Sequence, residues 1–303
     1  MLGKKTSPIK EKRRYFRRLH IPKKQDHANN NLIDDVVNAT NVGINFAYQY
    51  LIPFFQENAN KELRKNLRLF KGKQGHKRLL RFSFLRGLAY AVETTTQHCA
   101  SKSRSFMKHT RVLSQHELTR ALLYLPQESR QILFEQQHRL NIGKNRHWRF
   151  IREFNGALAV ARVAYALIDM GLPTYLPTIQ EDRELTIDLL ATVDTRRYGM
   201  CLQIKGTAKE QYTTYHVLPR KPDNESPFID QDEALALWEG TEYFNHLHET
   251  RWTPVHILVG LDIPAKQWAV EECTLPYEMI RDLLETYYPD LPIFKDQDPH
   301  SAG

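Results

Sequence analysis

The sequence predicts an α/β domain in its C-terminal half, with a mixed sheet flanked by helices, preceded by an all-α basic N-terminal region. Three observations predict this division. Up to about residue 140, apolar residues recur at the three- and four-residue spacing of helices. Beyond about residue 145, short β-rich runs alternate with helical segments. The charge also changes sign, because residues 1–150 hold 30 Lys and Arg against 10 Asp and Glu, whereas residues 151–303 hold 13 against 25.

The N-terminal half divides into a short arm and a helical region. Residues 1–30 are predicted to be a disordered basic arm, since they are rich in Lys and Arg and lack apolar periodicity. Residues 31–143 are predicted to form a helical basic region that binds nucleic acid or a partner. A capping-box pattern from Ser114 to Glu117 predicts a helix start, and the basic run 102–110 before it predicts a linker. A plain helical bundle is favoured over a helix-turn-helix unit, because no convincing recognition helix follows residue 137.

The C-terminal half, residues 144–303, predicts one compact domain. A helix over 150–170 is expected to end at Gly171, and a second helix is expected to start after the cap Asp230 and to run through His248. The remaining elements are predicted as strands over 172–176, 185–193, 200–205, 213–218, 256–263 and 267–272, and a last helix over 277–287.

Composition excludes several classes of protein. Hydrophobic residues make up 41% of the 303 residues and charged residues 26%, as in ordinary globular chains. No apolar run is long enough to span a membrane, and no secretory signal is recognisable. The three cysteines lie far apart, so neither a disulfide scaffold nor a cysteine zinc site is expected. We therefore expect a cytoplasmic protein, associated with the nucleoid if it is bacterial. No phosphate-loop motif of an NTPase is present.

The segment 181–206 carries the residues with predicted chemistry. Asp188 stands in an otherwise apolar strand, and Gln203 and Lys205 lie two apart on the next strand, so their side chains leave the same face of the sheet. A carboxylate and an amide oxygen suit Mg²⁺. A lysine can orient or help to deprotonate a water molecule, or stabilise charge on phosphate. The set predicts phosphodiester hydrolysis assisted by Mg²⁺ or Mn²⁺.

These residues, with the phrases IDLLA, LQIKGT and HILVGLDI, resemble the PD-(D/E)xK nuclease superfamily over about 145–275. The Gln-x-Lys variant occurs in its resolvase-like, homing-endonuclease-like and transposase-nuclease members. The resemblance implies a restriction-endonuclease-like core, in which a helix, a hairpin, a second helix and another strand follow one another. It implies that Asp188 is the principal metal carboxylate, that Gln203 fills the second ligand position, and that Lys205 is the catalytic lysine.

Family members often add a glutamate from the first helix, and Glu153 is the candidate for this catalytic and metal-binding role. It lies two turns earlier than the usual position, so Glu181 or Asp182 could substitute. The departure leaves a catalytically inactive member as an alternative.

The function predicted is that of a metal-dependent DNA endonuclease whose basic half holds the nucleic acid. One alternative is an inactive nuclease-fold scaffold that binds DNA in a nucleoprotein complex, and another is an RNA-directed nuclease. The partners expected are therefore DNA or RNA, with a homodimer or a larger nucleoprotein complex as the assembly, and no membrane. The residues predicted to contact nucleic acid are Arg13, Arg14, Arg17, Arg18, Lys77, Arg78, Arg196, Arg197, Thr207 and Lys209.

Overall fold

The structure is a computed structural model of the chain. It describes residues 17–23, 26–27, 31–51, 59–95, 101–136, 139–140, 147–193, 197–207, 213–222, 230–261, 270, 274–291 and 294.

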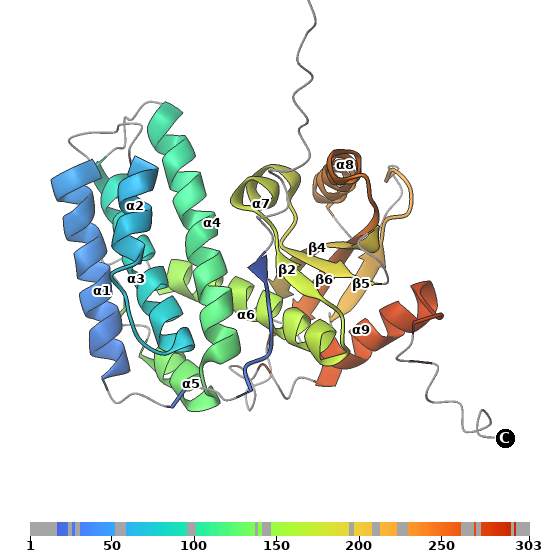
Figure 1. Ribbon diagram of the computed structural model, residues 1–303, viewed down its shortest axis with the longest axis horizontal. Helices are drawn as coiled ribbons and strands as arrows, with labels where there is room; N and C mark the ends of the chain where they lie inside the picture. The colour runs from blue at the N-terminus through green and yellow to red at the C-terminus, as the bar shows by residue number, and fades with distance from the viewer. Residues whose placement is uncertain are drawn as a thin grey trace, which may run out of the picture.

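The N-terminal region is helical, as the sequence predicts. Its helices are α1 (Leu32–Phe46), continued by the π-helical turn Ala47–Leu51, and then α2 (Ala59–Leu67), α3 (Gln74–Thr95), α4 (Ser101–Tyr124) and α5 (Gln127–Glu135). Helix α3 packs against both α1 and α4, which places it at the centre of this part (Figure 1).

Helix α4 corrects two expectations. The run 102–110, predicted as a linker, belongs to one continuous helix that includes the whole capping-box pattern. Glu117, expected beside a helix start, is instead buried within the bundle, where both of its carboxylate oxygens accept hydrogen bonds from Arg78 of α3 at 2.9 Å. The spacing of Ser114 and Glu117 matches a capping box, but both residues lie inside α4. The ion pair with Arg78 compensates the buried charge of Glu117 there.

The C-terminal half contains a mixed sheet, as predicted. Its strands are β1 (Arg17–Arg18), β2 (Thr174–Leu176), β3 (Leu189–Thr192), β4 (Tyr198–Thr207), β5 (Thr214–Val217) and β6 (Arg251–Gly260). They are arranged in the order β1-β2-β3-β4-β6-β5, and every neighbouring pair is antiparallel except β4 and β6. The parallel pair requires a crossover, and helix α8 (Gln231–His248) lies within it.

The sheet differs from the predicted strands in two places. The strand expected over 185–193 is shorter, since β3 begins at Leu189, and Leu185 instead ends the short helix α7 (Ile179–Leu185), which Thr178 and Glu181 begin with a capping box. The expected disordered arm also contributes a strand, since β1 pairs with β2 and the Leu19 N–H donates to the Thr174 carbonyl at 2.8 Å. The strand predicted over 267–272 lies almost wholly outside the described residues.

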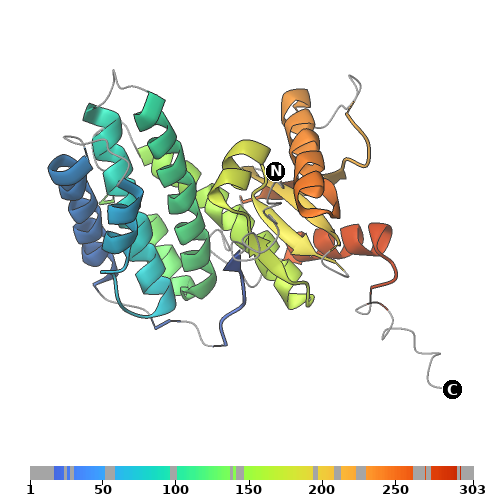
Figure 2. The ribbon, with the colours of Figure 1, turned by 45° about the horizontal axis from the view of Figure 1, so that its top comes forward.

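Helices cover both faces of the sheet (Figures 1 and 2). Helices α6 (His147–Asp169) and α9 (Thr274–Tyr287) cover one face, and α7 and α8 cover the other. As predicted, α6 is followed by Gly171 with a left-handed φ of 84°, and Asp230 caps α8. Helix α6 also packs against α4, so that residues of the bundle and of the sheet share one hydrophobic core.

Two glycines allow α1 and α3 to cross closely. A Cβ atom on Gly43 would lie 2.0 Å from the Phe84 carbonyl oxygen, and one on Gly87 would lie 2.1 Å from the Thr40 carbonyl oxygen. Because both obstacles are backbone atoms, a side chain at either position would force the helices apart.

We predict that Gly87→Ala destabilises the protein by about 2 kcal/mol or more, because the helices must separate at their contact. In an open helix the same change would stabilise by about 1 kcal/mol. Gly156→Ala in α6 is the matched control, since the nearest atom to its added Cβ would be the Gln115 amide nitrogen at 3.9 Å. Chemical denaturation of the three proteins measures the difference. Equal stability of both variants would contradict the close crossing.

Candidate metal and phosphodiester site

Four polar residues form a row across the middle of the sheet. Gln203 on β4 pairs with His256 on β6, and His256 pairs with His216 on β5. Asp188 immediately precedes β3, and its N–H donates to the Leu202 carbonyl at 2.8 Å, which sets it beside Gln203. Because side chains alternate along strands, this row lies on the face covered by α7 and α8, opposite the face covered by α6.

The carboxylate of Asp188 is held at the edge of β4. Its Oδ2 accepts a hydrogen bond from the Ile204 N–H at 2.8 Å. Ile204 lies on β4 beyond the part that pairs with β3, so the carboxylate satisfies a backbone donor that β3 does not reach. Although the residue as a whole is only half-buried, withdrawal of its carboxylate from water raises its pKa to about 7. The negative charges of Asp182 and Glu233 add to this rise, whereas the Ile204 N–H and the charge of Lys205 oppose it.

Lys205 is two residues beyond Gln203 and is held by an ion pair. Its Nζ lies 3.0 Å from the Glu233 Oε1, and the two side chains are 42% and 43% exposed. Glu233 lies in the first turn of α8, so the start of this helix positions it over the end of β4. The site therefore combines a lysine and a partly exposed carboxylate with the more enclosed Asp188.

Gln203 and His256 are buried polar residues, 5% and 2% exposed. The Gln203 Oε1 and both ring nitrogens of His256 have no hydrogen-bond partner among the described residues. Burial lowers the pKa of His256 to about 4, so its ring is neutral at pH 7. Buried polar atoms normally have partners, so this part of the row suits a water molecule or a cation.

His256 was not among the predicted site residues. The only signal for it in the sequence was a polar residue at the start of the apolar phrase HILVGLDI. The register of β4 and β6, which pairs His256 with Gln203, places it in the row.

The residues present fit a divalent metal ion. The orphaned Gln203 Oε1 and the Asp188 carboxylate are hard oxygen donors on neighbouring segments of the sheet. No group of three or more His, Cys, Asp or Glu residues suited to a metal forms within the described part of the chain. Mg²⁺ commonly binds proteins through one or two carboxylates and fills its other positions with water and phosphate oxygens. Asp188 and Gln203 would therefore be the residues that hold it.

The prediction for Glu153 was wrong. Glu153 lies on α6, which covers the opposite face of the sheet from the row of polar residues. Its Oε2 is 3.7 Å from the Arg86 Nε of α3, so it forms an ion pair with the bundle. Helical spacing cannot show which neighbour a glutamate meets, because tertiary packing decides it.

Of the two substitutes considered, Asp182 lies closer to the site. Glu181 forms the capping box of α7 and accepts a hydrogen bond from His248 at 2.9 Å. Burial alone would raise the pKa of Glu181, but hydrogen bonds from His248 and Thr178 outweigh it and lower the pKa. Asp182 is near enough to raise the pKa of Asp188, and it is bound to His116 of α4 at 2.7 Å.

The predicted nucleic-acid contacts fall into separate places. Arg18 is exposed on β1, and Lys77 and Arg78 lie on α3. Thr207 lies two residues beyond Lys205 on β4. Arg13, Arg14, Arg196 and Lys209 lie outside the described residues, and of Arg17 the structure describes only the backbone.

Arg197 stands at the other end of β4 from the site. It lies eight positions before Lys205, which corresponds to roughly 26 Å along an extended strand. Arg197 therefore cannot bind the phosphate that Lys205 would contact, although it could meet a distant part of a long nucleic acid.

Comparisons with family profiles, with curated proteins and with solved structures found no match. Among the helices that the structure describes, none has both the length and the apolar character needed to cross a membrane.

We predict that Asp188 makes stability depend on pH when no metal is present. Because its pKa is raised from 3.8 to about 7, the folded state binds the proton more tightly than the unfolded state. The contribution of Asp188 to the free energy of unfolding is complete below pH 3.8 and is lost as the pH rises through about 7. The free energy of unfolding falls over this range by at most about 1.4 kcal/mol per pH unit.

Asp188→Asn should remove this dependence and make the protein more stable than wild type at pH 8 in EDTA. Asparagine retains an oxygen that can accept the Ile204 hydrogen bond. Added Mn²⁺ should stabilise wild type at pH 8 but not the variant. Thermal unfolding from pH 4 to 8 measures both effects. An unchanged pH slope in the variant would contradict the assignment of the raised pKa.

Glu233→Gln should move the pH-dependent loss of stability that Asp188 causes to lower pH. The change removes a negative charge that raises the pKa of Asp188 and leaves the side chain of similar size. Glu239→Gln on the exposed face of α8 is the control, because its partner is Lys221 at 3.8 Å. If both variants shift the transition equally, Glu233 has no specific effect on Asp188.

Proposed function

We propose that this protein is a metal-dependent nuclease that hydrolyses phosphodiester bonds in DNA. The observation that carries the proposal is the convergence of Asp188, the orphaned Gln203 oxygen and Lys205 on one face of the sheet. The order of α6, the hairpin of β3 and β4, α8 and β6 agrees with the core that the resemblance implies, which supports the proposal.

Asp188 and Gln203 would hold Mg²⁺ or Mn²⁺. A bound divalent cation would polarise the phosphate and lower the pKa of an attacking water molecule. The same positive charge would keep Asp188 ionised at neutral pH, because an opposite charge offsets the desolvation that raises its pKa.

Lys205 would stabilise the negative charge that develops on the phosphate. Its ammonium group can donate to a non-bridging oxygen or to the attacking water. Glu233 limits the positions of this group through the 3.0 Å ion pair, and the partial exposure of both side chains leaves room for a substrate. Glu233 would therefore act as a positioning residue for Lys205.

The helical region would supply the affinity for nucleic acid. The C-terminal half has a net negative charge, so bulk electrostatics there would repel DNA. The basic helical region lies directly beside the site, because His116 of α4 is bound to Asp182 of α7. The shared core makes a deletion of the helical region unsuitable as a test, since it would expose the face of α6 that packs against α4.

We predict that the protein nicks or linearises supercoiled plasmid in Mg²⁺ or Mn²⁺ and not in EDTA. Asp188→Asn and Lys205→Ala should each lower the rate at least about a hundredfold, because each removes a group that acts on the charge of the transition state. Lys221→Ala is the matched control for Lys205, since it removes an exposed lysine that is also paired with a glutamate.

The same assay separates the alternatives. Salt-sensitive plasmid binding without cutting under any metal condition would overturn the nuclease and favour a scaffold. The position of Glu153 on the opposite face is the observation that favours this second candidate. Cutting of a matched single-stranded RNA but not of DNA would replace the proposed substrate with RNA.

A further inference from the structure

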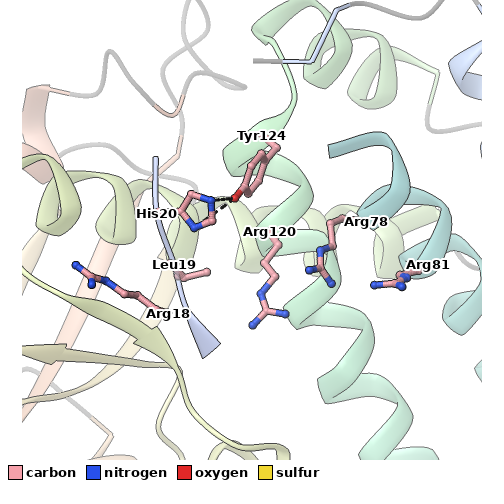
Figure 3. A pocket seen from close by; sticks show the side chains of 7 residues that line it. All are labelled: Arg18, Leu19, His20, Arg78, Arg81, Arg120 and Tyr124. Carbon is pink, nitrogen blue, oxygen red and sulfur yellow. Dashed lines mark hydrogen bonds between the residues drawn. The ribbon is translucent and has the colours of Figure 1, made fainter. Parts of the chain in front are cut away.

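A basic pocket of about 350 Å³ lies between the segment after β1 and the helices α3 and α4. Its polar lining consists of Arg18 at the end of β1, His20 from the segment, Arg78 and Arg81 from α3, and Arg120 and Tyr124 from α4 (Figure 3). The segment is held in place by the β1 pairing and by the buried side chain of Leu19. The pocket therefore joins residues that are more than 50 positions apart in the chain.

Positive charge dominates this pocket. Glu117 is the buried carboxylate beside it, and both of its oxygens accept hydrogen bonds from Arg78 at 2.9 Å. The Arg81 Nη1 is 4.0 Å from the same carboxylate. Asp26 lies beyond Tyr124 and accepts a hydrogen bond from the His76 N–H. Among the described residues that line or border the pocket, these two carboxylates stand against four arginines, so positive charge is in excess there.

Arg120 is the most enclosed of the four, being 5% exposed. Its side chain and that of Arg78 extend in a similar direction from neighbouring helices, and the Arg81 side chain extends toward Arg78 (Figure 3). A guanidinium presents several donors in one plane, which suits the oxygens of a phosphate. The Tyr124 hydroxyl, which is hydrogen-bonded to His20, is a further polar group at the wall.

Helix α4 connects the pocket to the candidate metal site. His116, Arg120 and Tyr124 follow at four-residue spacing, so they share one face of the helix. His116 contacts Asp182, which lies near Asp188. Arg120 is one helical turn further along, a rise of about 6 Å.

We propose that this pocket binds a phosphate group of the nucleic acid that is cut at the metal site. The proposal rests on the proposed function for the source of the phosphate, which is either an internal backbone phosphate or the phosphate at a strand end. The pocket would fix the position of the strand, while the metal site would act on another phosphodiester of the same nucleic acid.

The test measures binding of a fluorescent 30-base-pair duplex by anisotropy in EDTA, over a series of salt concentrations. Arg120→Gln should weaken binding at least tenfold and lower the salt slope by about one phosphate contact. Arg120→Lys should give a smaller loss, because lysine retains the charge without the planar donors. Arg111→Gln is the matched control, since Arg111 lies on the same helix and is 55% exposed outside the pocket.

The source of the phosphate is tested with duplexes that carry or lack a 5′-phosphate. If its removal weakens wild type but not Arg120→Gln, the pocket binds a strand end. If its removal changes neither, and Arg120→Gln still binds more weakly than Arg111→Gln, the pocket binds a backbone phosphate. Circular dichroism verifies that the variants are folded, and Arg81→Gln is the second variant should Arg120→Gln not fold.

Equal binding by Arg120→Gln and Arg111→Gln would overturn the proposal that the pocket binds a phosphate group. Plasmid cutting by wild type would in that case still support the proposed function. Failure of wild type to bind any nucleic acid would overturn both. Calorimetry then measures binding of inorganic pyrophosphate to wild type and to Arg120→Gln. Binding that Arg120→Gln abolishes would indicate a site for small phosphorylated ligands. No binding to wild type would show that the cluster binds no phosphate.

Discussion

The structure depends on the burial of helix α6 between two layers. This helix packs against α4 on one side and against the sheet and α9 on the other, and most of its middle residues are fully buried. Small side chains such as Ala157, Ala161 and Ala164 allow this close packing. The buried Arg162 reaches the Gly260 carbonyl at the end of β6, so even its polar group is directed to the sheet. Because one helix completes both layers, the bundle and the sheet form a common core.

The candidate site follows from what this arrangement leaves on the other face of the sheet. Most of the buried apolar residues of β3, β4 and β6 turn toward α6, and the alternating positions present Asp188, Gln203, Lys205 and His256 toward α7 and α8. The two helices add Asp182 and Glu233. A carboxylate withdrawn from water near two other acids is costly when ionised, and a cation at this position would offset that cost.

The contact between α4 and α7 gives the basic helical region a direct relation to this chemistry. His116 and Asp182 join the bundle to the site, and Arg120 lies one turn along the same helix. Nucleic acid held by the bundle would therefore be presented to the metal site without a linker between binding and cutting. In the proposed function, the acidic half would then not need to attract DNA by itself.

The sequence by itself determined the helical and α/β halves, α8 with its cap at Asp230, and the shared face of Gln203 and Lys205, because periodicity and capping are local properties of the chain. It could not determine the partner of Glu153, the continuity of α4 or the neighbour of Gln203 on β6. Those depend on contacts between residues far apart in the chain, in which a buried ion pair or a strand register overrides a local pattern. His256 and the arginine pocket belong to the same class, and only the tertiary structure brought their residues together.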